Sequence, residues 1–175
     1  MVVVGDNLKG LIRAKGICEE DLFDEFSVKI KLDRTIFRLT PIEGKVIKYG
    51  SHEVNEYYNQ ELLKDGELLL KSGECVLACS SQHITMPLGY IGFVQTKGTL
   101  ARLFVAAHCA DAQIEPGFSG KVTLEIMNQS PFDIAIPVGA NIAQVYVMRC
   151  STDNSKAYNG KYQSKEIPTL PLPFD

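Results

Sequence analysis

Short segments that alternate between apolar and polar residues recur along most of this 175-residue chain, and glycine or proline separates many of them. In FSVKIKL (26–32), Phe26, Val28, Ile30 and Leu32 fall on one face, as expected for a half-buried strand. Candidate strands occupy 26–32, 34–39, 67–71, 74–80, 83–86, 89–95, 121–128, 132–137 and 141–149. Many short strands with turn residues between them predict a mainly β protein, either a compact barrel or a jelly roll.

The N-terminal residues 6–15 predict one α-helix ahead of the strands. Its apolar residues recur at helical spacing, at Leu8, Leu11 and Ile12. Asp6 is the expected N-cap and Gly16 the expected stop. Residues 40–65 are polar and mixed, and they predict a long excursion, either an insertion or irregular strands.

The whole chain, 1–175, predicts a single domain, because 175 residues can bury one sizeable core. The tail from about 151 carries three prolines between 168 and 173 and little periodicity. We therefore expect a mobile or docking segment there rather than a core element.

Charge and cysteine content restrict the partners and the compartment. The formal net charge is -3, so no overall basic field attracts nucleic acid. No apolar run approaches the roughly 20 residues that span a bilayer, and the first ten residues do not form a signal peptide. The five cysteines include no CxxC pair, which favours reduced thiols in a cytoplasmic protein. Cys75 and Cys79 fall on one face of a strand, and we expect buried thiols there.

Common catalytic and nucleotide motifs are missing from the sequence. The histidines have no HxE or HExxH spacing and no PCxxC follows, so the pattern of a zinc deaminase is absent. The sequence also contains no GxSxG, GxGxxG or GxxxxGK[ST] motif. Spacing alone still leaves a Ser-His-Asp or a Cys-His arrangement open.

The basic turn TKGTLAR (96–102) is a candidate anion site. Lys97 supplies charge, Gly98 allows close backbone approach, and Thr99 offers a hydroxyl. A short helix over 98–103 would point free N–H groups at the same place. The alternative is an ordinary surface turn, with Arg102 in a surface or interface ion pair.

KVTLEIMN (121–128) carries a candidate acid or base. Val122, Leu124 and Ile126 form its apolar face, and Glu125 lies on the opposite face. If that face is open to solvent, Glu125 is an ordinary surface residue. If a loop or a neighbouring subunit covers it, the carboxylate can serve in proton transfer.

Further polar groups come from AHCADAQIEPGFSG, just before that strand. His108, Asp111 and Glu115 lie there, and Glu115 precedes a Pro-Gly turn. Glu115 is either a capping group or an acceptor for a ligand hydroxyl. Phe118 either packs in the core or stacks on a base.

QTKGTLAR, IEPGFSGKVTLEIMN and AYNGKYQ together resemble the dCTP deaminase family of the dUTPase-like superfamily. The resemblance covers most of the chain but not residues 40–65. It implies a distorted jelly-roll β-barrel with a mobile C-terminal tail, and a homotrimer with active sites between subunits. The implied reaction is zinc-independent hydrolysis of dCTP to dUTP and ammonia, with Mg²⁺ bound through the substrate triphosphate.

The resemblance also implies residue roles. Glu125 activates the water that attacks cytosine C4, and Arg102 orients Glu125. Asp111 stands where the loop meets the base, and Glu115 contacts the deoxyribose. The phosphates are assigned to Lys97, Gly98 and Thr99, with Tyr158 and Lys161 of the tail closing over them.

The sequence departs from the family pattern at three positions of the expected site. Lys97 replaces an arginine, Gly98 a serine, and Asp111 a small residue. Two other functions stay open on these residues. One is a dUTPase, or a bifunctional enzyme that releases dUMP. The other is a non-catalytic, nucleotide-binding regulator.

Overall fold

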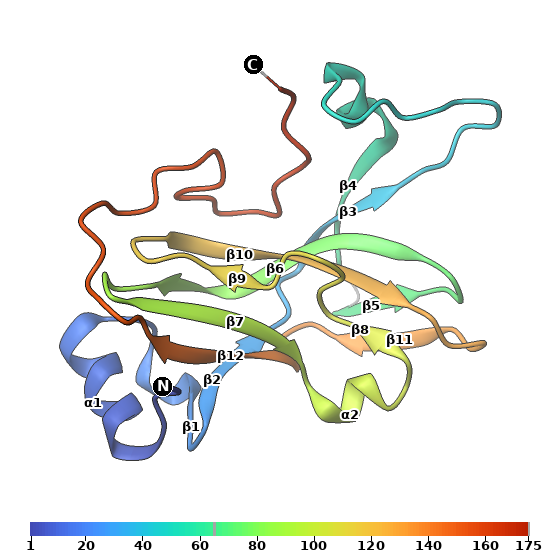
Figure 1. The fold of residues 1–175 in the computed structure, drawn as a ribbon. Coiled ribbons are helices and arrows are strands. Elements are labelled where there is room, and N and C mark those ends of the chain that lie inside the picture. Colours follow the sequence, from blue (N-terminus) through green and yellow to red (C-terminus); the bar gives the residue numbers. More distant parts are fainter. Residues whose placement is uncertain (65, 175) are drawn as a thin grey trace.

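The computed structural model describes residues 1–64 and 66–174, and its strands form two five-stranded sheets and a two-stranded ribbon (Figure 1). The first sheet has the order β1 (Phe23–Asp24), β2 (Ser27–Lys31), β12 (Asn141–Arg149), β7 (Tyr90–Thr96), β9 (Gln113–Ile114). The second has the order β4 (Tyr58–Leu62), β3 (Thr35–Leu39), β6 (Cys75–Thr85), β10 (Ser119–Asn128), β8 (Val105–Ala106). The ribbon pairs β11 (Ile134–Pro137) with β5 (Glu67–Leu70).

The hydrophobic core fills the space between the layers. In Figure 1, β6 and β10 lie above β7 and β12. Leu124 and Ile126 of β10 are fully buried, as are Val28 and Ile30 of β2. Inward-facing aliphatic residues from both sheets therefore form one core, as the alternating pattern predicts. The mainly β, jelly-roll-like architecture with an N-terminal helix is confirmed.

Helix α1 (Gly5–Lys15) covers one end of the core, with Leu8 and Ile12 buried. Gly16 ends it in the left-handed conformation, with φ 63°, as predicted. The expected N-cap at Asp6 is wrong, since the N-cap is Val4 and has no side-chain capping bond. The Gly5 N–H donates to Glu25 O at 2.7 Å, so a tertiary contact fixes where the helix begins.

Two of the differences between the expected and observed strand boundaries have clear physical reasons. The segments at 74–80 and 83–86 form one strand, β6, because β10 pairs with both halves across a bulge between Lys121 and Thr123. Phe26 lies outside β2 and is 62% exposed. Because Asp24 pairs with Ser27, Phe26 belongs to the tight turn of this hairpin.

Residues 40–64 contain regular structure that the sequence pattern did not indicate, and residue 65 of the expected excursion lies outside the described residues. A 3₁₀ helix, η2 (His52–Tyr57), precedes β4, and β4 pairs with β3 along five residues. β4 is an edge strand whose side chains are mostly exposed, so it lacks an apolar alternation. The other 3₁₀ helix, η1 (Glu20–Leu22), follows α1.

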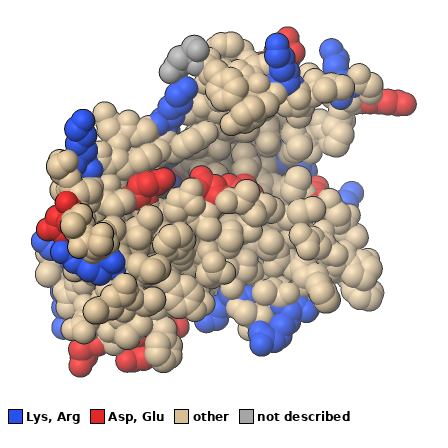
Figure 2. Space-filling model, in the orientation of Figure 1, with Lys and Arg blue, Asp and Glu red and all other residues tan. Residues whose placement is uncertain are grey.

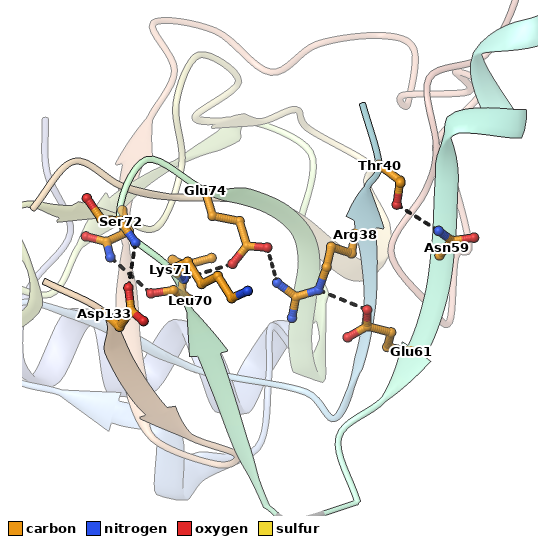
Figure 3. Close-up of polar contacts among 10 residues, drawn as sticks. Arg38, Thr40, Asn59, Glu61, Leu70, Lys71, Ser72, Glu74 and Asp133 are labelled. Atoms are coloured by element: carbon orange, nitrogen blue, oxygen red, sulfur yellow. Dashed lines mark hydrogen bonds and ion pairs between the residues drawn. The ribbon is translucent and has the colours of Figure 1, made fainter. Parts of the chain in front are cut away.

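Arg38 of β3 ties the edge strand to the sheet. Figure 3 shows its guanidinium between Glu61 of β4 and Glu74, which precedes β6. The Nε–Oε1 distance to Glu61 is 2.9 Å. This network holds β4, and with it Tyr58, against the rest of the second sheet.

The expectation of buried thiols holds for Cys79 but fails for Cys75, which is exposed. Both cysteines pair with residues on one side of β10, Thr123 and Met127, so they do share a face. Burial raises the pKa of the Cys79 thiol to about 12. In the described parts of the chain, no helix is long and apolar enough to cross a membrane.

Candidate active site

A cavity of about 510 Å³ lies between β10, the segment before it and the C-terminal tail. Its walls come from residues far apart in the sequence: Tyr58, Leu77, Asp111, Gln113, Ile114, Glu115, Phe118, Lys121, Val122, Thr123, Glu125, Tyr158, Tyr162, Thr169 and Pro171. Five of the residues singled out from the sequence line it, namely Asp111, Glu115, Phe118, Glu125 and Tyr158.

Strand β10 places Glu125 on the cavity wall. Leu124 and Ile126 turn into the core, so Glu125 faces the opposite side, as the alternation predicts. The loop after β8 reaches that face, where the exposed Cys109 donates its N–H to Oε2 of the half-buried Glu125 at 3.2 Å. The Cys109 thiol also donates to the backbone oxygen of Glu125 at 3.3 Å. The loop after β8 therefore fixes one carboxylate oxygen.

The lining of the cavity is rich in acidic groups. Asp111, Glu115 and Glu125 supply three carboxylates, and Lys121 supplies the one ammonium among the described lining residues. Figure 2 shows acidic side chains along the hollow that crosses the visible face. Lys121 Nζ is already paired with Asp33 Oδ2 at 2.8 Å.

Lys121 and Asp33 form a largely buried ion pair at the cavity, and their side chains are 18% and 13% exposed. Burial opposes the charge on Asp33, but hydrogen bonds from Lys121 and from the Thr35 N–H outweigh it and lower the pKa. Burial likewise opposes the charge on Lys121, yet the bond to Asp33 raises its pKa. Both groups are therefore held ionised.

Aromatic side chains form another part of the lining. The rings of Phe118 and Tyr158 are tilted by 51°, with centroids 6.2 Å apart. Burial raises the pKa of the Tyr158 hydroxyl, and the carboxylates of Glu115 and Asp111 raise it further, against a backbone hydrogen bond from Tyr162. The Tyr158 hydroxyl is therefore a neutral donor near neutral pH.

The C-terminal tail winds through several turns and docks along β10, so the docking alternative holds (Figure 1). The Ser164 N–H donates to Ser119 O, and the Lys121 N–H donates to Lys165 O, both at 2.8 Å. The Gln163 side chain accepts from Ser119 N–H at 3.0 Å and donates to Gly117 O at 2.9 Å. The Thr169 N–H donates to Thr123 Oγ1 at 3.0 Å. These bonds hold the tail over the cavity.

The basic turn at 96–102 does not lie at the cavity. α2 (Gly98–Ala101) is a single short helix, as predicted, and Figure 1 shows it on the opposite side of the molecule from the tail. Arg102 Nη1 donates to Gly98 O at 2.8 Å, within the same turn. Among the described residues, the cavity lining does not include Lys97, Gly98, Thr99 or Arg102.

Lys161 also lies outside the lining, and its ammonium donates to Pro173 O at 3.0 Å within the tail. Lys121, Asp33 and Tyr58 were not predicted from the sequence as site residues. Lys121 carried a weak signal, because it shares the Glu125 face of KVTLE. The described residues contain no group of three His, Cys, Asp or Glu side chains that could hold a metal ion.

Comparisons with known proteins agree with this fold. The family model described as dCTP deaminase-like matches residues 4–150. The chain is 30% identical over 121 residues to the dUMP-forming dCTP deaminase of Halobacterium salinarum, covering 66% of this chain and 62% of that protein. It is 31% identical over 124 residues to a dCTP deaminase of Idiomarina loihiensis, covering 66% and 63%. The matched part thus spans less than two thirds of either relative's length.

A solved structure of a 2'-deoxycytidine 5'-triphosphate deaminase from Agrobacterium tumefaciens superposes with a TM-score of 0.62. It is 15% identical, and the match covers 83% of this chain and 46% of that one, so it establishes the shared fold alone. The family match extends over most of the chain, from α1 to the end of β12. The chain therefore belongs to the dCTP deaminase-like family of hydrolases.

Proposed function

We propose that this protein deaminates dCTP, or a close deoxycytidine nucleotide, by zinc-independent hydrolysis to dUTP and ammonia. The observation that carries the proposal is the position of Glu125, on the wall of a cavity with one carboxylate oxygen held by the Cys109 N–H. The cavity, at about 510 Å³, falls within the ordinary range for small-ligand sites.

Glu125 would act as the general acid and base. With Oε2 held by Cys109, Oε1 would take a proton from water as the water oxygen attacks C4 of the base. The protonated Glu125 gives that proton to the ring nitrogen N3, then takes the proton of the new C4 hydroxyl and delivers it to N4. The C4–N4 bond breaks, ammonia leaves and uracil remains. Proton transfer by a positioned carboxylate contributes about 10²- to 10⁴-fold in rate.

The other lining residues suit the rest of a nucleoside. Asp111 would accept a hydrogen bond from the amino group of the base, and Glu115 one from a sugar hydroxyl. The Phe118 and Tyr158 rings would pack against the apolar faces of the ligand. Tyr158 and Lys161, both in the tail, would close over the phosphates.

The cavity of one chain has no spare positive charge among its described lining residues, because Lys121 is paired with Asp33. A triphosphate needs cationic or N–H partners. We assign this role to Lys97, Gly98 and Thr99 of a second copy, with its Arg102 beside Glu125. A homotrimer with sites between subunits would bring the two halves together. Mg²⁺ would enter as part of the substrate, on the phosphate oxygens.

The second candidate is a bifunctional enzyme that releases dUMP, which the name of the Halobacterium relative favours. The test is to incubate the protein with Mg²⁺ and each common dNTP and NTP, then separate the products by ion exchange. Conversion of dCTP to dUTP supports the main proposal. dUMP with pyrophosphate supports the second candidate. Saturable binding without turnover would contradict both and favour a regulator.

A further inference from the structure

The end of the tail is clasped by the segment between β3 and β4 (residues 40–57). The Phe174 N–H donates to Gly50 O at 3.1 Å. The Phe174 ring meets the ring of Tyr49 edge to face, with centroids 4.7 Å apart. Figure 1 shows the C-terminal end of the chain above the body of the sheets, on the side where η2 lies. We call Tyr49, Gly50 and Phe174 the tail clasp.

Gly50 is suited to this contact in two ways. Its φ of +80° favours glycine, and a Cβ built there would lie 2.2 Å from the Phe174 ring. The ring therefore occupies the space that any other side chain at position 50 would need. Gly44, in the same segment, has a similar φ of +72° but nothing within 4 Å of an added Cβ.

The tail contributes directly to the cavity, and segment 40–57 leads into a strand that does. Tyr58 follows η2 and lines one wall, while Thr169 and Pro171 line the cavity from the tail. The beginning of the tail is anchored separately, by Gln163 and Ser164 on β10. Losing the clasp would therefore loosen the end of the tail, beyond the bonds that Thr169 N–H makes to Thr123 and that Pro173 O accepts from Lys161, without undocking Gln163 and Ser164.

The clasp is weak enough to open. Phe174 is 57% exposed and Tyr49 is 84% exposed, so the contact buries little apolar area. A contact of this size can break and re-form while the core stays folded. A ligand could then enter when the clasp opens, and the clasp could hold the tail over it afterwards.

We propose that the tail clasp is a positioning device that keeps the tail folded over a bound nucleotide and so strengthens its retention. The ligand part of this inference rests on the proposed function above. Tyr49, Gly50 and Phe174 take no part in the chemistry. The clasp should therefore change the KM for the nucleotide and leave kcat nearly unchanged.

The test compares Gly50→Ala with Gly44→Ala, because both add a methyl group at a positive φ and only the first collides with Phe174. Phe174→Ala is the second variant, since it removes the ring without straining the backbone. The readouts are amide hydrogen exchange of residues 166–174 without ligand, the KM and kcat for dCTP, and the melting temperature.

We expect Gly50→Ala and Phe174→Ala to speed exchange at 166–174 and to raise the KM by about 5-fold or more, as for a typical coupling between sites. We expect kcat within roughly two-fold of wild type, and Gly44→Ala to match wild type in exchange and KM. Equal rates of amide hydrogen exchange at 166–174 in Gly50→Ala and Gly44→Ala would contradict the existence of the tail clasp. Faster exchange with an unchanged KM would overturn its role in retention. If the wild-type protein turned over no deoxycytidine nucleotide, the proposed function and the retention role would fail, while the exchange data would still decide whether the clasp exists.

Discussion

The Glu125 cavity and the α2 turn are opposite in charge and in construction. The cavity gathers three carboxylates from β10 and the segment before it, and the tail covers it. The α2 turn carries Lys97 and Arg102, and the Arg102 bond to Gly98 O is local and exposed. On the proposed function, neither region alone would hold a nucleotide triphosphate and also position a catalytic carboxylate. We therefore propose that one chain supplies two half-sites that face different directions.

The strongest test of the difference between the two regions is to remove the proposed proton-transfer group from the cavity. Glu125→Gln keeps the shape and the bond from Cys109 but loses the base. We expect ammonia release from dCTP to fall by about 10²- to 10⁴-fold, with nucleotide binding retained. Glu67→Gln is the control, because Glu67 is exposed on β5 and does not line the cavity. Equal deamination by the Glu125→Gln variant and wild type would exclude Glu125 as the base.

The corresponding substitution in the α2 turn is Arg102→Ala. We expect activity to fall on the order of 10²-fold, because stabilisation by an oriented charge near the reacting atoms is lost. The melting temperature should stay close to that of wild type, since Arg102 makes only a local bond to Gly98 O among the described contacts. Activity assays and thermal unfolding of the same samples check both outcomes. A large loss of stability would mean that Arg102 has a structural role.

Asp33→Asn is expected to lower the stability of the protein, in contrast to Arg102→Ala, which is expected to lower its activity. It leaves the largely buried ammonium of Lys121 without its partner, and we expect a cost of about 2 kcal/mol in the free energy of unfolding. The pKa of Asp33 is lowered, so the ionised carboxylate stabilises the fold above about pH 4 and this contribution is lost as pH falls through the folded-state pKa. The raised pKa of Lys121 gives a contribution that is present below about pH 10 and lost as pH rises further.

Denaturant unfolding from pH 3 to 7 checks the Asp33 prediction. The difference between wild type and Asp33→Asn should shrink toward the acid end. Asn59, an exposed residue of β4, offers a matched control through Asn59→Ala, for which we expect a change within about 0.5 kcal/mol. A difference that stays constant across this pH range would contradict the charged pair.

The smallest effect is expected at Asp111. A carboxylate there would accept a hydrogen bond from the amino group of cytosine and would repel the carbonyl oxygen of uracil. Asp111→Ala should therefore narrow the preference for dCTP over dUTP, by about 5- to 10-fold, with the fold intact. Competition binding of the two nucleotides measures this. An unchanged ratio would show that Asp111 does not read the base.

Features set by neighbouring residues could be predicted from the sequence, and features set by contacts between distant segments could not. The face of Glu125 follows from a local alternation, and Gly16 ends α1 through its own backbone conformation, so both were predictable. The pairing of Lys121 with Asp33 was not, because the residues are 88 positions apart and each is placed by its own contact with β6. The single strand β6 likewise depends on the bulge in its pairing with β10. β4 was not predicted because the side chains of this edge strand are mostly exposed, so its sequence does not alternate between apolar and polar residues.

The direct test of the shared site is to mix two inactive variants. Glu125→Gln and Arg102→Ala are each purified, mixed in equal amounts, dissociated and reassociated, and assayed for ammonia release from dCTP. If each site takes Glu125 from one copy and Arg102 from another, some sites regain both residues, and activity should return to roughly a quarter of wild type with random exchange. Each variant treated alone should stay inactive. Reassociated mixtures that contain both chains, shown by mass tagging, yet remain inactive would contradict a site built from two copies.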